Sequence, residues 1–361
     1  MVRLDAIVHN HRVLGRRGGG TGRVIPVLKA DGYGHGAVPL ARRLSAEGVD
    51  FFAVAIAPEG IALRQAGIAG EILLLNFTDP AEAPACRGYG LIPVLHDLAQ
   101  AAAFAEASRG FSGPLPVHMK VDTGMGRLGI APGEIGQMAD LLRRAPGLAL
   151  RGTLTQFSRA DEDDPSPTRR QIETMRSALD ALRAAGIEPG LVHVANSAGA
   201  LLHEGSAFDA VRPGIALYGI PPSASREDSD LLPAMSVETQ IMAVRQVAVG
   251  RAAGYGTSFV AARPSTIAVL PIGYDDGLRR SFSGKISVLL PGGRAPIVGA
   301  VSMDMTLVDA TDCGAAPGEF AVLLGARGAD RVTAWELARA AGTIPYEIVC
   351  GIGRRVPRVY A

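Results

Sequence analysis

Eight short apolar segments that alternate with helical patterns constrain the fold of this chain most strongly. They span residues 24–29, 51–56, 71–76, 91–95, 116–122, 151–157, 191–196 and 209–214. Several of the helical patterns between them end in glycine, a frequent helix stop; the weakest is 79–90, which we expect to be a poor helix. Strands buried on both faces and separated by helices are typical of a parallel (β/α)8 barrel, with a doubly wound sheet as the alternative. The number of strands favours the barrel.

The pattern changes near residue 220, where the polar segment PPSASREDSD resembles a linker. After it, β-type runs are separated by turn signals such as PGG, and one helical pattern covers residues 334–342. We therefore predict an α/β protein with an N-terminal (β/α)8 TIM barrel over residues 1–225. A C-terminal, mostly-β domain is expected over residues 226–361.

Composition narrows the class of protein. Thirty-six basic and 35 acidic residues give a net charge of +1, which is not the electrostatic pattern of a protein that binds nucleic acid or an anionic membrane. The three cysteines are widely spaced, which argues against a disulfide framework or a cysteine zinc site. The amino terminus is charged where a signal peptide needs an apolar core, and no apolar run reaches the ~20 residues of a membrane helix. We expect a cytoplasmic protein without a metal, nucleic-acid or membrane partner.

Lys29 is the first candidate for chemistry because it ends the apolar segment VIPVLK. The carboxyl ends of the strands face the active site in a (β/α)8 barrel. A lysine desolvated there can become a nucleophilic amine and form a Schiff base. The alternative is a strand-end lysine whose ammonium group reaches solvent. The glycine-rich loop that follows allows a tight turn, and Tyr33 adds a hydroxyl.

The stretch VLKADGYGHG, residues 27–36, resembles the pyridoxal-phosphate lysine motif of alanine racemases. Six further segments match that family in the same order and extend the resemblance over nearly the whole chain: HMKVDTGMGRLG, HVANSAGAL, VRPGIALYG, GYGTSF, PIGYDDG and VSMDMTLVD. The resemblance implies a homodimer in which the C-terminal domain of each subunit completes the partner's active site. It also implies pyridoxal 5'-phosphate as the cofactor and D-alanine for peptidoglycan as the product.

By the same resemblance, two bases act on opposite faces of the substrate carbon. Lys29 is one, and Tyr255 of the partner subunit is the other. Arg212 matches the arginine that meets the pyridine nitrogen. Because arginine only donates hydrogen bonds and stays protonated, it disfavours a second proton on that nitrogen. Such an arrangement favours simple proton exchange over transamination or decarboxylation, which argues against a decarboxylase.

The remaining site residues are also carried over from the family. Arg127 matches the arginine near the cofactor's phenolic oxygen and the substrate carboxylate, and Lys120 matches a lysine that is often carbamylated. The other positions serve the cofactor phosphate and the substrate: Tyr33, Ser197, Gly214 and Ile215 at the phosphate, Asn196 beside them, Met303 at the substrate carboxylate followed by Asp304, and Tyr274 at the narrow access channel.

The chain departs from the family at two of these positions. Gln156 replaces a histidine that packs on the cofactor ring and bonds the arginine equivalent to Arg212. Glutamine can accept from a guanidinium group but has no aromatic face and no titratable proton. Arg354 stands where many members have a tyrosine that touches the phosphate. An arginine there could still bind phosphate and could change which side chains are admitted.

Three functions remain open from the sequence. An alanine racemase matches all the motifs. A racemase of broader range, or one that acts on serine or basic amino acids, would use the same scaffold. A regulatory protein that carries pyridoxal phosphate without catalysis is the third possibility, although relatives of that kind lack the second domain that carries Tyr255.

Overall fold

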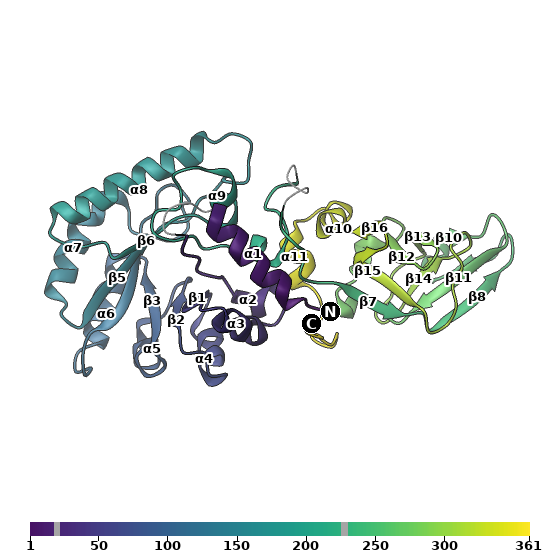
Figure 1. Ribbon diagram of the computed structural model, residues 1–361, viewed down its shortest axis with the longest axis horizontal. Helices are drawn as coiled ribbons and strands as arrows, with labels where there is room; N and C mark the ends of the chain where they lie inside the picture. The colour runs from purple at the N-terminus through teal and green to yellow at the C-terminus, as the bar shows by residue number, and fades with distance from the viewer. Residues whose placement is uncertain (18–21, 225–229) are drawn as a thin grey trace. The chain divides into compact units, whose positions relative to one another are not determined.

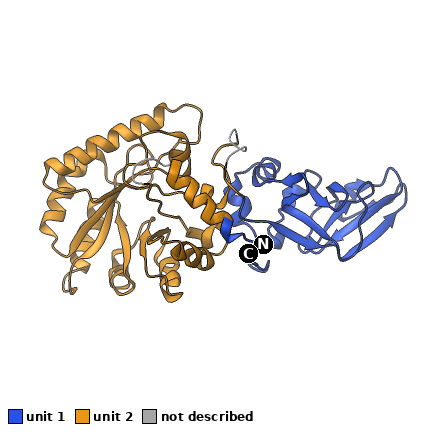
Figure 2. Cartoon of the chain, in the orientation of Figure 1, with its two compact units in different colours: residues 1–5, 233–361 blue, residues 6–232 orange. Residues whose placement is uncertain are grey.

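The computed structural model describes residues 1–17, 22–224 and 230–361. The chain forms two compact units, one of residues 6–232 and one of residues 1–5 with 233–361 (Figure 2). The domain boundary predicted between residues 225 and 226 lies outside the described residues and stays a prediction. Within the described ranges, no helix combines the length and the apolar character needed to span a membrane.

The larger unit contains a curved parallel sheet of six strands in chain order (Figure 1). Its strands are β1 (Phe51–Val54), β2 (Glu71–Leu74), β3 (Leu91–Leu95), β4 (Leu115–Lys120), β5 (Leu148–Leu154) and β6 (Leu191–His193). Every residue of β1 and β3 is buried, as expected for strands covered on both faces. All six lie within or overlap segments predicted as strands.

Two further predicted strands close this sheet without forming regular strands. Single parallel bridges link Val24 to Val211, Val27 to Ala53 and His193 to Ala210. Segments 24–29 and 209–214 contain Pro26 and Pro213, which have no amide hydrogen for a ladder. The predicted α/β fold with a barrel-like first domain is confirmed, but its first and last strands are irregular.

Helices connect the strands of the larger unit: α1 (Leu4–Arg17), α3 (Ala37–Ala46), α4 (Ala57–Gln65), α5 (Ala83–Tyr89), α6 (Leu98–Ala107), α7 (Ile135–Arg144), α8 (Ser166–Ala184) and α9 (Ser197–Leu202). Helix α7 buries Ile135, Met138, Ala139 and Leu142, one face at the helical period. The expectation of a poor helix over 79–90 was wrong. Asp79 caps a short 3-10 turn there, and α5 follows directly.

The smaller unit is mostly β, as predicted. Its main antiparallel sheet has the order β16-β15-β12-β13-β14-β11-β8, and β7 also pairs with β15. These strands are β7 (Val237–Gln240), β8 (Ala243–Val247), β11 (Ser265–Leu270), β12 (Ser287–Leu290), β13 (Gly293–Val298), β14 (Thr306–Asp309), β15 (Phe320–Arg327) and β16 (Asp330–Val332). The ribbon β9 (Ala252–Ala253) and β10 (Phe259–Val260) and the helices α10 (Ala334–Ala341) and α11 (Pro345–Cys350) complete the unit.

Candidate active site

Lys29 opens a left-handed turn rather than ending a strand. It is the first residue of α2 (Lys29–Tyr33), and Ala30, Asp31, Gly32 and Tyr33 have φ of 52°, 51°, 62° and 52°. A left-handed conformation costs roughly 1–2 kcal/mol for each residue with a side chain. Backbone strain of this kind persists where the surroundings hold it in place and is concentrated at functional sites. The half-buried Lys29 is therefore followed directly by a strained turn.

Side-chain carboxylates hold this strained turn at both ends. The amide of Ala30 donates to Oε1 of Glu59 at 2.7 Å, and the amide of Ala55 donates to Oε2 of the same carboxylate at 2.7 Å. At the other end, Oδ1 of Asp31 accepts from the amide of Ala37 at 2.8 Å. Hydrogen bonds to charged acceptors are the stronger kind. The backbone on either side of Lys29 is thus fixed by its neighbours.

Arg212 is a buried cation whose described partners are all uncharged. Its side chain donates from Nη1 to Nδ1 of His193 at 2.9 Å and to the carbonyl oxygen of His193. From Nη2 it donates to the carbonyl of Thr155 at 2.6 Å and to Oε1 of Gln156 at 3.3 Å. Burial lowers the pKa of Arg212 to about 9, so it remains charged at neutral pH. Of its five N–H groups, the Nε–H alone has no acceptor among the described residues.

Two buried histidines extend from Arg212. Because Nδ1 of His193 accepts from Arg212, the His193 proton lies on Nε2, and it donates to Nδ1 of His118 at 2.8 Å. Burial and then the charge of Arg212 lower the pKa of His118 to about 3 and the pKa of His193 well below its usual value. Both rings are neutral at pH 7, so the two hydrogen-bonded histidines orient the guanidinium group without adding charge.

Lys120, the last residue of β4, is a second buried cation on the barrel. Burial, then the charges of Arg127, Arg212 and Lys29, lower its pKa to about 8, and Asp122 opposes the shift. Arg127 itself is exposed on the loop after β4. In that loop Oδ1 of Asp122 accepts from the amide of Met125 at 2.8 Å and from the amides of two glycines. One carboxylate therefore shapes the loop that carries Arg127.

Ser197, Gly214 and Tyr33 form a compact polar group. The Ser197 hydroxyl oxygen accepts from the amides of Gly214 at 3.0 Å and Ala216 at 3.2 Å, which leaves its proton to donate elsewhere. A side chain at Gly214 would place its Cβ 2.3 Å from the Tyr33 hydroxyl oxygen. Asn196 caps α9, and within the described residues the Ile215 amide has no acceptor. These hydroxyl and amide donors suit an anion such as a phosphate group.

The remaining predicted residues lie on the smaller unit. Tyr255 begins a 3-10 turn (Tyr255–Thr257) and is 72% exposed. Tyr274 and Met303 lie on two loops joined by hydrogen bonds from the Tyr274 amide to the Ser302 carbonyl at 3.0 Å and from the Asp275 amide to the Met303 carbonyl at 3.2 Å. Tyr274, Met303 and Arg354 are also exposed. The structure thus places these residues on surface loops of a β unit.

An arginine that the sequence analysis did not single out holds these loops together. Arg355 binds three carboxylates: Nε to Asp276 at 2.6 Å, Nη1 to Asp275 at 3.0 Å and Nη2 to Asp304 at 2.8 Å. The Asp276 carboxylate also accepts from the amide of Gly273 at 2.8 Å. This guanidinium group therefore joins the loops that carry Tyr274 and Met303.

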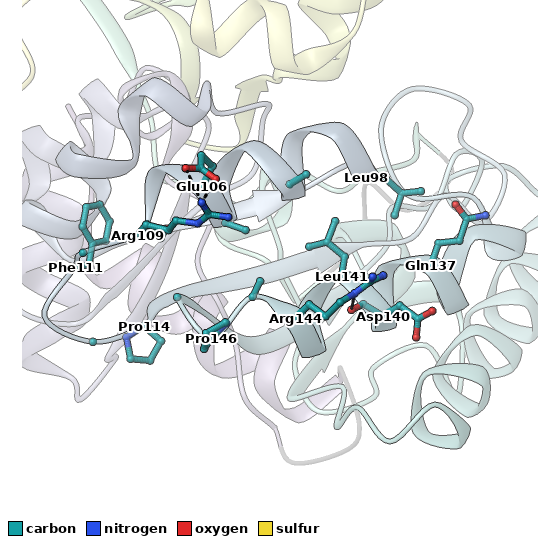
Figure 3. Close-up of a pocket in the computed structure, with 17 residues that line it drawn as sticks. Leu98, Glu106, Arg109, Phe111, Pro114, Gln137, Asp140, Leu141, Arg144 and Pro146 are labelled. Atoms are coloured by element: carbon teal, nitrogen blue, oxygen red, sulfur yellow. Dashed lines mark hydrogen bonds and ion pairs between the residues drawn. The ribbon is translucent and has the colours of Figure 1, made fainter.

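One cavity of the structure lies away from these residues (Figure 3). It is lined by α6, α7 and the segments 113–114 and 145–147, which precede β4 and β5. Residues at the amino ends of barrel strands serve stability, whereas active sites occupy the carboxyl ends. Lys29, Lys120, Gln156 and Asn196 all follow or end strands on that carboxyl side. The cavity contains none of the predicted site residues.

Comparison with known families gives a consistent result over both units. The profile of the alanine racemase N-terminal domain matches residues 2–222, and that of the alanine racemase C-terminal domain matches residues 234–360. The chain belongs to the alanine racemase family. The predicted family membership and the prediction of an enzyme of this family are confirmed.

Individual relatives of this family match along nearly their whole length. The chain is 42% identical to the alanine racemase of Carboxydothermus hydrogenoformans over an alignment of 363 positions that covers 99% of this chain and 98% of that protein. It is 41% identical to the alanine racemase of Symbiobacterium thermophilum, covering 99% and 96%. The crystal structure of Bacillus anthracis alanine racemase with bound L-Ala-P superposes with a TM-score of 0.93 at 34% identity, covering 100% and 94%.

Sequence reasoning missed several groups around the predicted residues. His118 and His193 stand inside two of the quoted motifs, but their alternation with apolar neighbours gave no sign that they form a chain to Arg212. Glu59 lies in α4, 30 residues after Lys29, and belongs to none of the quoted motifs. Arg355 adjoins the predicted Arg354, and only the folded loops show that it is the residue bound to three carboxylates.

Proposed function

We propose that this protein is a pyridoxal-phosphate-dependent racemase that interconverts L-alanine and D-alanine. The observation that carries the proposal is the hydrogen bonding of Arg212. Four of its N–H groups have neutral acceptors within the barrel, and its Nε–H remains to donate to a ring nitrogen. Family membership and the activity named for the relatives support the same reaction.

The barrel residues fit the cofactor in charge and in shape. Tyr33, Ser197 and the amide of Ile215 would hold the phosphate group, beside Gly214, where no side chain could fit. Arg212 would hold the pyridine nitrogen and keep it unprotonated, because a guanidinium group cannot accept a proton from it. When bound, the cofactor supplies an electron sink that makes the α-proton of an amino acid acidic.

The chain's own residues then hold and move the proton. Nζ of Lys29 would hold the cofactor covalently and, when free, would act as one base. Tyr255 of the partner subunit acts as the other, on the opposite face of the α-carbon. The deprotonated tyrosine oxygen would take the α-proton of L-alanine while the ammonium group of Lys29 delivers one to the opposite face. For D-alanine, the neutral amine of Lys29 would take the proton and the tyrosine hydroxyl would deliver one. This requires a homodimer in which each smaller unit serves the partner's barrel.

The substrate carboxylate has two proposed partners. Arg127 provides a charged donor from the loop after β4, and the backbone amide of Met303 provides a neutral one from the smaller unit. Asp304 follows in the same loop, and Tyr274 narrows the access channel. A carbamylated Lys120 would add a negative charge beside Arg127 and relieve repulsion between two cations.

Arg354 motivates a second candidate function. It is exposed and charged where the family resemblance implies a tyrosine, and a different charge near the substrate would change which side chains are admitted. A racemase of serine or basic amino acids is therefore the alternative to test alongside alanine. For alanine, the product D-alanine would serve peptidoglycan synthesis in the cytoplasm.

The cofactor anchor can be tested sharply because the chain has only three lysines, Lys29, Lys120 and Lys285. Borohydride reduction of protein loaded with pyridoxal phosphate should place the cofactor mass on the peptide that contains Lys29. Lys29→Ala should lose the visible absorbance of covalently bound cofactor, whereas Lys285→Ala should retain it. Label on another lysine, or an unchanged absorbance band in Lys29→Ala, would contradict the proposal.

A further inference from the structure

Glu59, which is not one of the predicted site residues, accepts a hydrogen bond from the residue that follows Lys29. It lies in α4 and is half-buried. Its two carboxylate oxygens each accept one backbone amide at 2.7 Å, from Ala30 on one side and Ala55 on the other. Ala30 directly follows Lys29, and Ala55 directly follows β1, which bridges the Lys29 segment through Ala53 and Val27. The carboxylate thus joins the lysine turn to the neighbouring strand.

The turn needs such a support because its conformation is intrinsically unfavourable. Ala30 and Asp31 have side chains, yet both adopt left-handed dihedral angles at φ of 52° and 51°. An alternative right-handed path would relieve this strain and would change the direction in which the Lys29 side chain leaves the backbone. The bond from the Ala30 amide to Glu59 is made at the first of these strained residues.

We propose that Glu59 is a positioning residue for Lys29, which fixes the left-handed turn so that Nζ meets one face of the substrate α-carbon. This inference rests on the proposed racemase function. Glu59 does not touch the reacting atoms; it acts through the backbone of Ala30. Its loss should therefore affect proton transfer on the Lys29 face more than proton transfer on the tyrosine face.

The test uses Glu59→Gln in the full-length holoenzyme. A glutamine has the same shape, but its amide nitrogen cannot accept, so one of the two backbone amides loses its acceptor. Glu134→Gln is the matched control, because Glu134 also accepts a backbone amide, that of Ala131 at 3.1 Å, in a loop that has no bond to the Lys29 turn. Glu59→Asp, which keeps the charge on a shorter side chain, is the second variant.

Two readouts are compared. The first is exchange of the α-proton in deuterium oxide, started separately from L-alanine and from D-alanine. In Glu59→Gln we expect exchange from D-alanine to fall about tenfold to a hundredfold and exchange from L-alanine to fall clearly less, since a bond to a charged group is lost on one face only. The second is amide hydrogen exchange in peptides that cover residues 28–36 and 54–60, which should become faster in the Glu59 variants and stay unchanged in Glu134→Gln.

Each outcome decides the inference. Faster amide exchange with selective loss from D-alanine supports it, and Glu59→Asp should show the same direction if Glu59→Gln does not fold. Equal loss from both enantiomers, or no loss with unchanged amide exchange, would overturn it. A wild-type protein that exchanges no amino acid would instead contradict the proposed function, while the amide exchange would still report whether Glu59 fixes the turn.

Discussion

The two units of this protein hold positive charge in opposite ways. In the larger unit, Arg212 is buried and bonded only to neutral groups within the described residues, and Lys120 is buried with its pKa lowered to about 8. In the smaller unit, Arg355 is half-exposed and bound to the carboxylates of Asp275, Asp276 and Asp304. The same type of residue thus has two different environments.

The different surroundings of Arg212 and Arg355 indicate different roles for the two guanidinium groups. A carboxylate beside Arg212 would neutralise it, whereas neutral acceptors leave its field to act on a bound ligand in a low-dielectric site. The three carboxylates around Arg355 neutralise its charge and join the loops that carry them. The two units also differ in histidine content, because all seven histidines belong to the larger unit and none to the smaller one.

The largest effect on activity is expected at Tyr255, the proposed base on the smaller unit. Tyr255→Phe removes the proposed base for L-alanine, so α-proton exchange from L-alanine should fall about a hundredfold or more, and exchange from D-alanine should fall much less. The measurement is the exchange rate from each enantiomer in deuterium oxide. Equal losses from both enantiomers would show that the tyrosine is not a face-specific base.

Acid should lower the free energy of unfolding of the larger unit more than that of the smaller unit. His118 is neutral in the folded protein with a pKa of about 3, whereas an unfolded histidine binds a proton below about pH 6.5. Between these values the unfolded state binds more protons, so the free energy of unfolding falls as the pH falls, by up to about 1.4 kcal/mol per pH unit for each such histidine. His193 adds to the effect in the same direction.

Hydrogen exchange at pH 7 and pH 5, corrected for intrinsic rates, would measure this difference. Peptides of the barrel strands should lose protection at pH 5, while peptides of β11 to β15 should lose less. A His118→Gln variant should be less stable at pH 7 but less sensitive to acid. If the smaller unit lost protection first, buried neutral histidines would not be the cause of acid sensitivity.

A smaller effect is expected at Gln156, where the family resemblance implies a histidine. Gln156→His restores an aromatic ring beside Arg212, so pyridoxal phosphate should dissociate about fivefold more slowly if the ring adds ~1 kcal/mol of contact. Because the charged Arg212 lies beside this position, the new ring should have a pKa below the usual value of histidine, and the activity profile should change on the acid side of neutral pH. Cofactor release, followed by absorbance after dilution, measures the first effect. Gln137→His on the surface of α7 is the control.

Much of the fold could be predicted from periodicity alone. Apolar β-branched runs located β1 to β6, because strands covered on both faces leave a continuous hydrophobic signal. The first and last runs carried the same signal, but Pro26 and Pro213 prevent a regular ladder, and only the structure shows the bridges that replace it. Segment 79–90 forms a 3-10 turn capped by Asp79 and then α5, and the capping bond is a local interaction that composition does not reveal.

The candidate site was predictable where motifs carry it and not elsewhere. Lys29 was expected at a strand end, but the four left-handed residues that begin at Ala30 could not be inferred, because three of them are not glycine. The partners of Arg212 come from segments far apart in the chain. Such contacts depend on how strand ends converge, which no single segment encodes.

The central claim is that Lys29 and Tyr255 of the partner subunit move the α-proton of alanine while Arg212 holds the ring nitrogen of the cofactor. Its most direct test is α-proton exchange in deuterium oxide, with protein loaded with pyridoxal phosphate and L-Ala, D-Ala, L-Ser, L-Lys and L-Arg followed by NMR. We predict fast exchange and inversion with alanine and much slower exchange with the others. A preference for serine or a basic amino acid would contradict an alanine racemase and support the alternative racemase that Arg354 motivates. No exchange with any of these amino acids would contradict a racemase.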